Sequence, residues 1–172
     1  ANTGENQGTA AGNDGSVDGI LAVSVGTVTE TEVNFGIVQQ PGSIGDTVWY
    51  DADGNGAQNG VEVGLEGATV TLDPGTPGDS SDDVSVLTDS DGEYLFSNLP
   101  AGDYTVSVDV STVTGGLPVG VTVGELSQTY DNDGTGSANT SDVTLEAGEE
   151  NDAQDFGYEG VGSIGDTVWC DF

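Results

Sequence analysis

The 172-residue chain contains no lysine, arginine or histidine, and its 31 aspartates and glutamates give it a formal charge of −31. These absences exclude imidazole bases, Schiff-base lysines, arginine clamps and Ser-His-Asp triads. We expect no nucleic-acid partner and no binding to anionic membranes, because both need cationic side chains. The single cysteine, Cys170, cannot form a disulfide within the chain. No apolar run approaches the roughly 18 residues that a membrane-spanning helix requires, so no membrane insertion is expected.

Apolar residues are also scarce, at 34% of the chain. Low hydrophobicity with high net charge is typical of disordered segments. Here, however, the apolar residues are gathered in alternating runs, which favours a folded chain. A folded state must then offset the repulsion among its carboxylates, and divalent cations are the natural candidate.

An internal repeat indicates how the chain is organised. The ten residues from Gly42 to Asp51 return as Gly162 to Asp171, 120 positions later, with nine of ten identical. We expect residues 1–41 to be the tail of a preceding repeat, with a loop over 1–19 followed by its last strands. Residues 42–160 would form one complete repeat, and residues 161–172 the first strand of a following one.

Within residues 42–160 the hydrophobic period is two, as in β-strands. Seven short runs separated by Gly, Asp, Asn and Pro carry this pattern: residues 47–50, 68–72, 84–86, 94–96, 104–110, 143–145 and 153–158. No window shows a helical period. The expected fold is all-β: an antiparallel immunoglobulin-like or prealbumin-like β-sandwich of about seven strands, tandemly repeated.

The segment from Asp51 to Glu62 fits the twelve-residue calcium-loop pattern. The flanking residues are β-branched and aromatic, so this would be the loop of an EF-hand without its helices. Its alternative is a solvated turn rich in Asp, Asn and Gly. The predicted calcium ligands are Asp51, Asp53, Asn55, the carbonyl of Ala57, Asn59 directly or through water, and a bidentate Glu62.

Weaker metal candidates lie elsewhere in the chain. Asp89 and Asp91 fit a hairpin turn better than a metal site, which remains the alternative. Asp131 and Asp133 resemble half a calcium loop, with metal and no metal equally open. Asp171 would repeat the role of Asp51 in the next repeat.

Two further features admit a functional and a plain interpretation. Asn139-Thr140-Ser141 is a glycosylation sequon, which makes a glycan at Asn139 possible. Trp49 and its repeat counterpart Trp169 could stack on sugars, but a packed tryptophan within a strand is the simpler interpretation.

Several spaced motifs, in order, resemble the calcium-binding B domains of serine–aspartate-repeat surface adhesins. They are residues 42–49, 51–56, 64–70 and 88–106, and the resemblance covers about 42 to 160. It implies a sandwich stiffened by calcium and arranged in rod-like arrays outside the cell. The related collagen-adhesin B-type domains often carry a Lys–Asn isopeptide crosslink, which a chain without lysine cannot form.

The predicted function is mechanical: a calcium-stiffened module of a repetitive extracellular or cell-surface protein, serving as stalk, adhesin arm or filament subunit. Its expected partners are neighbouring repeats or identical subunits, assembled head to tail. The alternative is a module that binds carbohydrate or a host protein on the same sandwich. Burial of Trp49 and Tyr50 would favour the strut, and an exposed aromatic patch the binding module. We expect no enzyme. The composition leaves open one catalytic class, a carboxylate-pair glycosidase, but Asp and Glu are so numerous here that a pair within reach carries almost no information.

Overall fold

The computed structural model describes residues 2–5, 35–37, 40–60, 62–75 and 80–161. The chain divides into two units, residues 1–40 and 41–172. In the first unit, β1 (Asn2–Glu5) pairs antiparallel with β2 (Phe35–Ile37). The expected loop over 1–19 is therefore wrong at its start, because backbone pairing with β2 makes a strand of residues with weak strand propensity.

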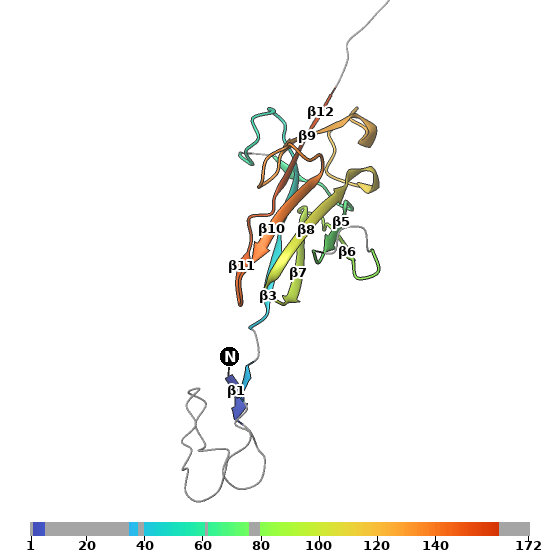
Figure 1. Cartoon of the computed structure of the whole chain (residues 1–172). Helices are drawn as coiled ribbons and strands as arrows, with labels where there is room; N and C mark the ends of the chain where they lie inside the picture. The colour runs from blue at the N-terminus through green and yellow to red at the C-terminus, as the bar shows by residue number, and fades with distance from the viewer. Residues whose placement is uncertain (1, 6–34, 38–39, 61, 76–79, 162–172) are drawn as a thin grey trace, which may run out of the picture. The chain divides into compact units, whose positions relative to one another are not determined.

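The second unit is a sandwich of two sheets (Figure 1). The larger sheet has the order β11-β3-β12-β9, with β4 and β7 also paired to β3, and the smaller has the order β10-β8-β5-β6. The strands of the larger sheet are β3 (Gly42–Tyr50), β4 (Val63–Gly64), β7 (Glu93–Leu99), β9 (Leu126–Tyr130), β11 (Glu150–Asn151) and β12 (Phe156–Gly160). Those of the smaller are β5 (Thr69–Asp73), β6 (Val84–Leu87), β8 (Gly102–Asp109) and β10 (Thr140–Leu145). Two 3-10 turns, η1 (Val110–Thr112) and η2 (Val123–Glu125), complete the unit.

The predicted β-sandwich is confirmed, and each of the seven runs overlaps a strand. In β8, for example, Tyr104, Val106 and Val108 are buried while the residues between them are more exposed. The strands β4, β9 and β11 were not predicted, because two are only two residues long and β9 carries polar residues at most of its positions. The core lies between the two sheets and includes Ile44, Val48, Leu65, Val70, Leu72, Phe96, Val106, Leu145, Phe156 and Tyr158.

Two pairings depart from the antiparallel expectation. β3, which opens the unit, pairs in parallel with β12, which closes it, with Val48 opposite Phe156 and Tyr50 opposite Tyr158. β11 also pairs with β3 in parallel. Because β3 and β12 run in the same direction, the chain enters the unit at Gly42 and leaves it at Gly160 at opposite ends of the strand pair (Figure 1).

Trp49 is packed inside the protein, as its plain interpretation predicted. Its side chain is 1% exposed and its ring centroid lies 5.5 Å from that of Tyr130. A methyl group on Gly157 would lie 2.7 Å from Trp49 Cζ2, so the glycine makes room for the indole. Tyr50 is half-buried, and its hydroxyl accepts a hydrogen bond from the Gly160 N–H. This burial favours the strut over an aromatic sugar-binding surface.

Candidate metal centre

The candidate site begins where β3 ends. Asp51 follows Tyr50 directly, and its backbone N–H donates to the Tyr158 carbonyl at 2.7 Å. This hydrogen bond ties the first residue of the loop to β12. The Asp51 side chain is 1% exposed, although charged residues are rarely buried without a partner. The loop is therefore built around a buried carboxylate.

Asp51 organises the first half of the loop by accepting backbone hydrogen bonds. Its Oδ1 accepts from the N–H groups of Gly54 and Asn55 at 2.7 and 3.2 Å, and its Oδ2 accepts from the Gly56 N–H at 2.8 Å. Gly56 adopts a φ of 71°, the left-handed conformation that the turn requires at this position. Burial acts to raise the pKa of Asp51, but the Thr129 hydroxyl and the backbone donors together outweigh it, and the pKa lies below its usual value.

Glu62 closes the second half of the loop. Its Oε1 accepts from the Ala52 N–H at 2.9 Å, and its Oε2 accepts from the Asn59 N–H at 2.8 Å. Both ends of the loop are thus held by one carboxylate. This arrangement draws Glu62 toward the aspartates at the start of the loop.

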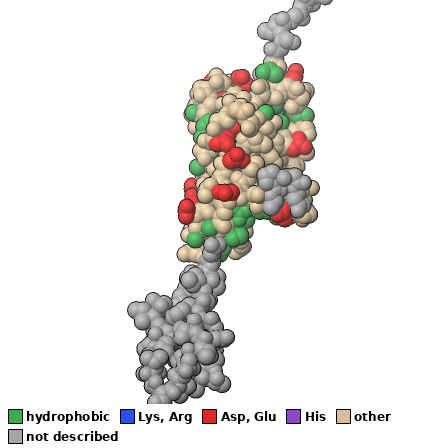
Figure 2. Space-filling model, in the orientation of Figure 1, with side chains coloured by type: hydrophobic (Ala, Val, Ile, Leu, Met, Phe, Trp, Pro, Cys, Tyr) green, Lys and Arg blue, Asp and Glu red, His purple; other side chains and the backbone are tan. Residues whose placement is uncertain are grey.

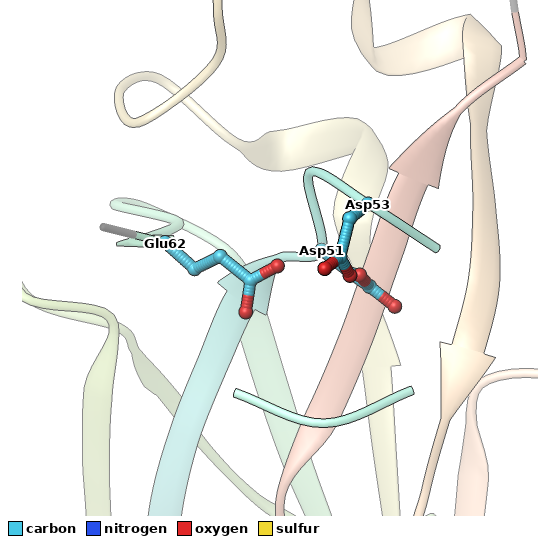
Figure 3. A group of neighbouring side chains, drawn as sticks. All are labelled: Asp51, Asp53 and Glu62. Carbon is cyan, nitrogen blue, oxygen red and sulfur yellow. The ribbon is translucent and has the colours of Figure 1, made fainter. Parts of the chain in front are cut away.

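Three carboxylates converge as a result. Asp51, Asp53 and Glu62 each offer an oxygen within 4.8 Å of the others, and Figure 3 shows the carboxylate of Glu62 directed toward those of Asp51 and Asp53. The chain has no cationic side chain that could neutralise them. Carboxylate and carbonyl oxygens in this number suit a hard cation such as Ca²⁺.

The other predicted ligands of this loop lie within it. Asn55 Oδ1 accepts from the Ala57 N–H at 2.8 Å, and the Ala57 carbonyl accepts from Asn59 Nδ2 at 2.9 Å. Their oxygens are available to a cation only in addition to, or in exchange for, these hydrogen bonds.

Asp89 and Asp91 lie in a turn, outside that group of three. Asp89 Oδ1 accepts from the N–H groups of Asp91 and Glu93 at 2.9 and 3.0 Å. Gly92, with a φ of 79°, donates its N–H to the Asp89 carbonyl. These contacts confirm the turn, which the Asp89 carboxylate stabilises. The predicted hairpin is wrong, because the strands that the turn joins, β6 and β7, lie in different sheets and do not pair with each other.

Asp131 and Asp133 lie in the segment that directly follows β9. Asp131 is 4% exposed, and its Oδ2 accepts from Gln128 Nε2 at 2.6 Å. Its Oδ1 is buried and accepts no hydrogen bond from the described residues. Burial raises the pKa of Asp131, and the neighbouring charge of Asp133 raises it further. Asp142, at position twelve from Asp131, donates its N–H to Asp133 Oδ2 at 2.9 Å.

Sequence reasoning did not single out Glu159, which lies on β12 against the loop. A methyl group on Gly54 would lie 2.6 Å from Glu159 Oε2. No spacing in the sequence could have found it, because Glu159 follows the loop by about a hundred residues and reaches it through the β3–β12 pairing.

Asn139 precedes β10 with a φ of 60°. Ser141 of its sequon is fully buried, and its hydroxyl donates to Gln154 Oε1 at 2.8 Å. Asp171, Trp169 and Cys170 lie outside the described residues.

Comparison with known proteins gives consistent matches. The model of the SdrD B-like domain matches residues 42–158. The serine-aspartate repeat-containing protein D of Staphylococcus aureus strain MW2 is 32% identical over 168 residues, covering 94% of this chain and 12% of that protein. Protein F of Staphylococcus epidermidis is 29% identical, with 94% of this chain and 9% of that protein covered. The chain thus spans a small part of these relatives.

Among solved structures, GBS52, the minor pilin of Streptococcus agalactiae, aligns with a TM-score of 0.46 at 14% identity, covering 80% of this chain and 52% of that one. In the part of the chain that the structure describes, no helix is long and apolar enough to cross a membrane.

Proposed function

Given that the chain belongs to the family of SdrD B-like domains, we propose that it is a calcium-stiffened structural module of a surface adhesin. The predicted family and the predicted location at the cell surface are confirmed by this membership. The family consists of surface-adhesin modules rather than enzymes. The observation that carries the calcium proposal is the convergence of Asp51, Asp53 and Glu62 in a chain without cations.

The proposed calcium ligands are the carboxylates of Asp51, Asp53 and Glu62, with oxygens of Asn55, Ala57 and Asn59 completing the shell. This set supplies the six to eight oxygens that calcium takes. A bound cation would neutralise the mutual repulsion of the three carboxylates. The loop would then be most stable in the conformation that the structure shows.

The mechanical role is supported by the parallel pairing of β3 and β12. When two strands run in parallel and the chain leaves from opposite ends, a pull on the ends loads their hydrogen bonds in shear. The ladder from Val48–Phe156 to Tyr50–Tyr158 would then resist as a group, instead of opening one bond at a time. This arrangement suits a module that carries tension along a stalk.

Calcium would strengthen the same strand pair. The loop begins at Asp51, whose N–H is bonded to the Tyr158 carbonyl, and Gly54 lies against Glu159. A cation bound by Asp51 and Glu62 would fix Asp51 in place at the end of β3. Because Asp51 is bonded to Tyr158, the same cation would hold the end of β3 against the end of β12. Loss of the cation would free this end first, and the module would become easier to extend.

For assembly, we propose head-to-tail contact with neighbouring repeats or identical subunits. In this view residues 1–41 close a preceding repeat, residues 42–160 form the complete one, and residues 161–172 open the next, with Asp171 in the place of Asp51. The support is the repeat of residues 42–51 at 162–171 and the opposite positions of Gly42 and Gly160.

A second cation at Asp131 and Asp133 belongs to the same proposal. Its support is the buried Asp131 Oδ1, which has no hydrogen-bond partner among the described residues, beside a second carboxylate. Asp89 and Asp91 are the weakest of the metal ligands, because the turn already uses the Asp89 carboxylate. A glycan at Asn139 would have to be attached before folding, because Ser141 is buried in the folded module.

Single-molecule force spectroscopy on the whole chain tests the function. The unfolding force should be higher in calcium than in chelator, and Glu62→Gln should lose most of the difference. The matched control is Glu146→Gln, which removes the same charge from an exposed residue after β10. Equal forces in calcium and chelator would contradict the proposal.

A further inference from the structure

A groove of about 350 Å³ crosses the outer face of the larger sheet, and none of the residues that line it belongs to the calcium loop. It lies where β3 passes between β7 and β11. Its lining includes Gly45 of β3, Leu95 of β7 and Asn151 of β11. Neither the calcium site nor the strand pairing discussed above accounts for it.

The floor of the groove is apolar. Gly45 has no side chain, and a methyl group there would collide with the carbonyl of Tyr94, so the floor stays open at this position. Leu95 forms a wall and leaves 62% of its side chain exposed. An exposed leucine beside an open floor offers contact for an alkyl chain.

The rim is acidic. Five carboxylates line the groove: Asp46, Asp89, Glu93, Glu150 and Asp152. Figure 2 shows acidic side chains on the surface with no basic ones among them, as the sequence requires. Burial raises the pKa of nearby Asp155 to about 6. The charges of two rim residues, Asp46 and Asp152, also act to raise this pKa.

We propose that this groove binds the side chain of a lysine or arginine carried on an extended segment of another protein. Such a side chain has an apolar stem and a cationic head, and it commonly lays the stem on apolar surface while the head stays among polar groups. The stem would lie over Gly45 against Leu95, and the head among the rim carboxylates. A second copy of this chain is not the partner, because it carries no cation and a charge of −31.

A bare metal ion fits this groove less well than a long cation. In the described residues, three acidic groups converge within 4.8 Å at Asp51, Asp53 and Glu62, and the rim carboxylates form no such group. Asp89 is also committed to its turn. Carboxylates spread around an apolar floor suit a lysine or arginine side chain, whose charge lies at the end of an apolar stem.

The test uses the whole chain in calcium and physiological salt, with amide chemical shifts followed by NMR during titration. The probes are acetyl-Gly-Gly-Xaa-Gly-Gly-amide peptides in which Xaa is lysine, norleucine or diaminopropionate. Lysine has both stem and charge, norleucine has the stem alone, and diaminopropionate has the charge on a short stem. We expect saturable shifts around Gly45 and Leu95 with the lysine peptide, and weaker binding of both others.

Two variants with the same charge change separate the groove from general acidity. Glu93→Gln with Asp152→Asn removes two of the five rim charges and should weaken lysine binding roughly two- to thirtyfold, as expected for two exposed ion pairs. Glu146→Gln with Asp103→Asn removes two charges from exposed residues outside the groove, Asp103 of β8 and Glu146 just after β10, and should leave binding unchanged. Asparagine at 103 can still accept the hydrogen bond from the Thr144 hydroxyl.

The proposal depends on neither calcium nor tension, so its failure would leave the proposed function standing. Equal weakening in the two double variants would overturn it, as would norleucine or diaminopropionate binding as tightly as lysine. Shifts scattered over the whole surface would show nonspecific attraction instead. Displacement of the peptide by calcium, with saturable calcium shifts at the groove, would identify a metal site there and overturn the proposal.

Discussion

Chelation of calcium should destabilise this module by an amount that the geometry of the loop predicts. Oxygens of Asp51, Asp53 and Glu62 lie within 4.8 Å of one another. Two unit charges at that separation repel by about 1 kcal/mol even in the dielectric of water, so three pairs contribute about 3 kcal/mol. A cation bound only by the folded state stabilises it by about 2.7 kcal/mol at a hundredfold excess over Kd.

For a domain of this length, about 3 kcal/mol corresponds to a shift in melting temperature of roughly 10 °C. The measurement is a thermal unfolding curve by circular dichroism or calorimetry, at fixed protein concentration, in calcium and in chelator. Unfolding must be reversible for the shift to be interpreted as a free energy.

Glu62→Gln separates the metal from the loop itself. Glutamine can accept only one of the two N–H groups, from Ala52 and Asn59, that Glu62 accepts now. That loss costs about 1 kcal/mol, and the relieved repulsion offsets it. In chelator the variant should therefore melt close to the unchanged protein, whereas in calcium it should lack most of the increase.

The control, Glu146→Gln, should keep the full calcium-dependent increase. The reasoning would be refuted if chelator left the melting curve unchanged, or if Glu62→Gln kept the full increase. If Glu62→Gln lowered the melting temperature strongly even in chelator, the residue would stabilise the loop by its hydrogen bonds and not by a metal.

Three further predictions concern the rest of the module. Burial raises the pKa of Asp155 to about 6, so the folded state holds this proton more tightly than the unfolded state. The stability that the group contributes is therefore full below about pH 4 and is lost as the pH rises through 6. Asp155→Asn should therefore stabilise the module at pH 7 and flatten the pH dependence of urea unfolding, and an unchanged profile would contradict this. Gly157→Ala should destabilise by about 1–3 kcal/mol, because its methyl group would lie 2.7 Å from Trp49 Cζ2; a neutral effect in urea unfolding would mean that the indole can move aside. Ser141→Ala should cost about 1–3 kcal/mol by leaving buried Gln154 Oε1 without its 2.8 Å donor, and a double variant with Gln154→Leu that loses less than the sum of the two single losses would confirm the coupling.

Local chemistry was enough to predict the loop and most strands from the sequence. A calcium loop takes its ligands from twelve consecutive residues, so the spacing of Asp51, Asp53 and Glu62 already implies that they converge. Alternation of buried and exposed residues is also local, since successive strand residues point to opposite faces. The sequence therefore predicted the strands of a sandwich, although it missed β9, in which polar residues such as Gln128 occupy partly buried positions.

Tertiary structure alone decided which distant segments meet. The parallel pairing of β3 with β12 brings Glu159 against Gly54 and ties Asp51 to Tyr158, and no periodicity within either strand encodes that choice. The groove at Gly45 likewise exists only because β7 and β11 flank β3. Hydrophobic patterning determines which face of a strand is buried, whereas the choice of neighbouring strand depends on how the whole core closes. The sequence therefore predicted the loop of residues 51–62, and only the fold showed that this loop lies against β12.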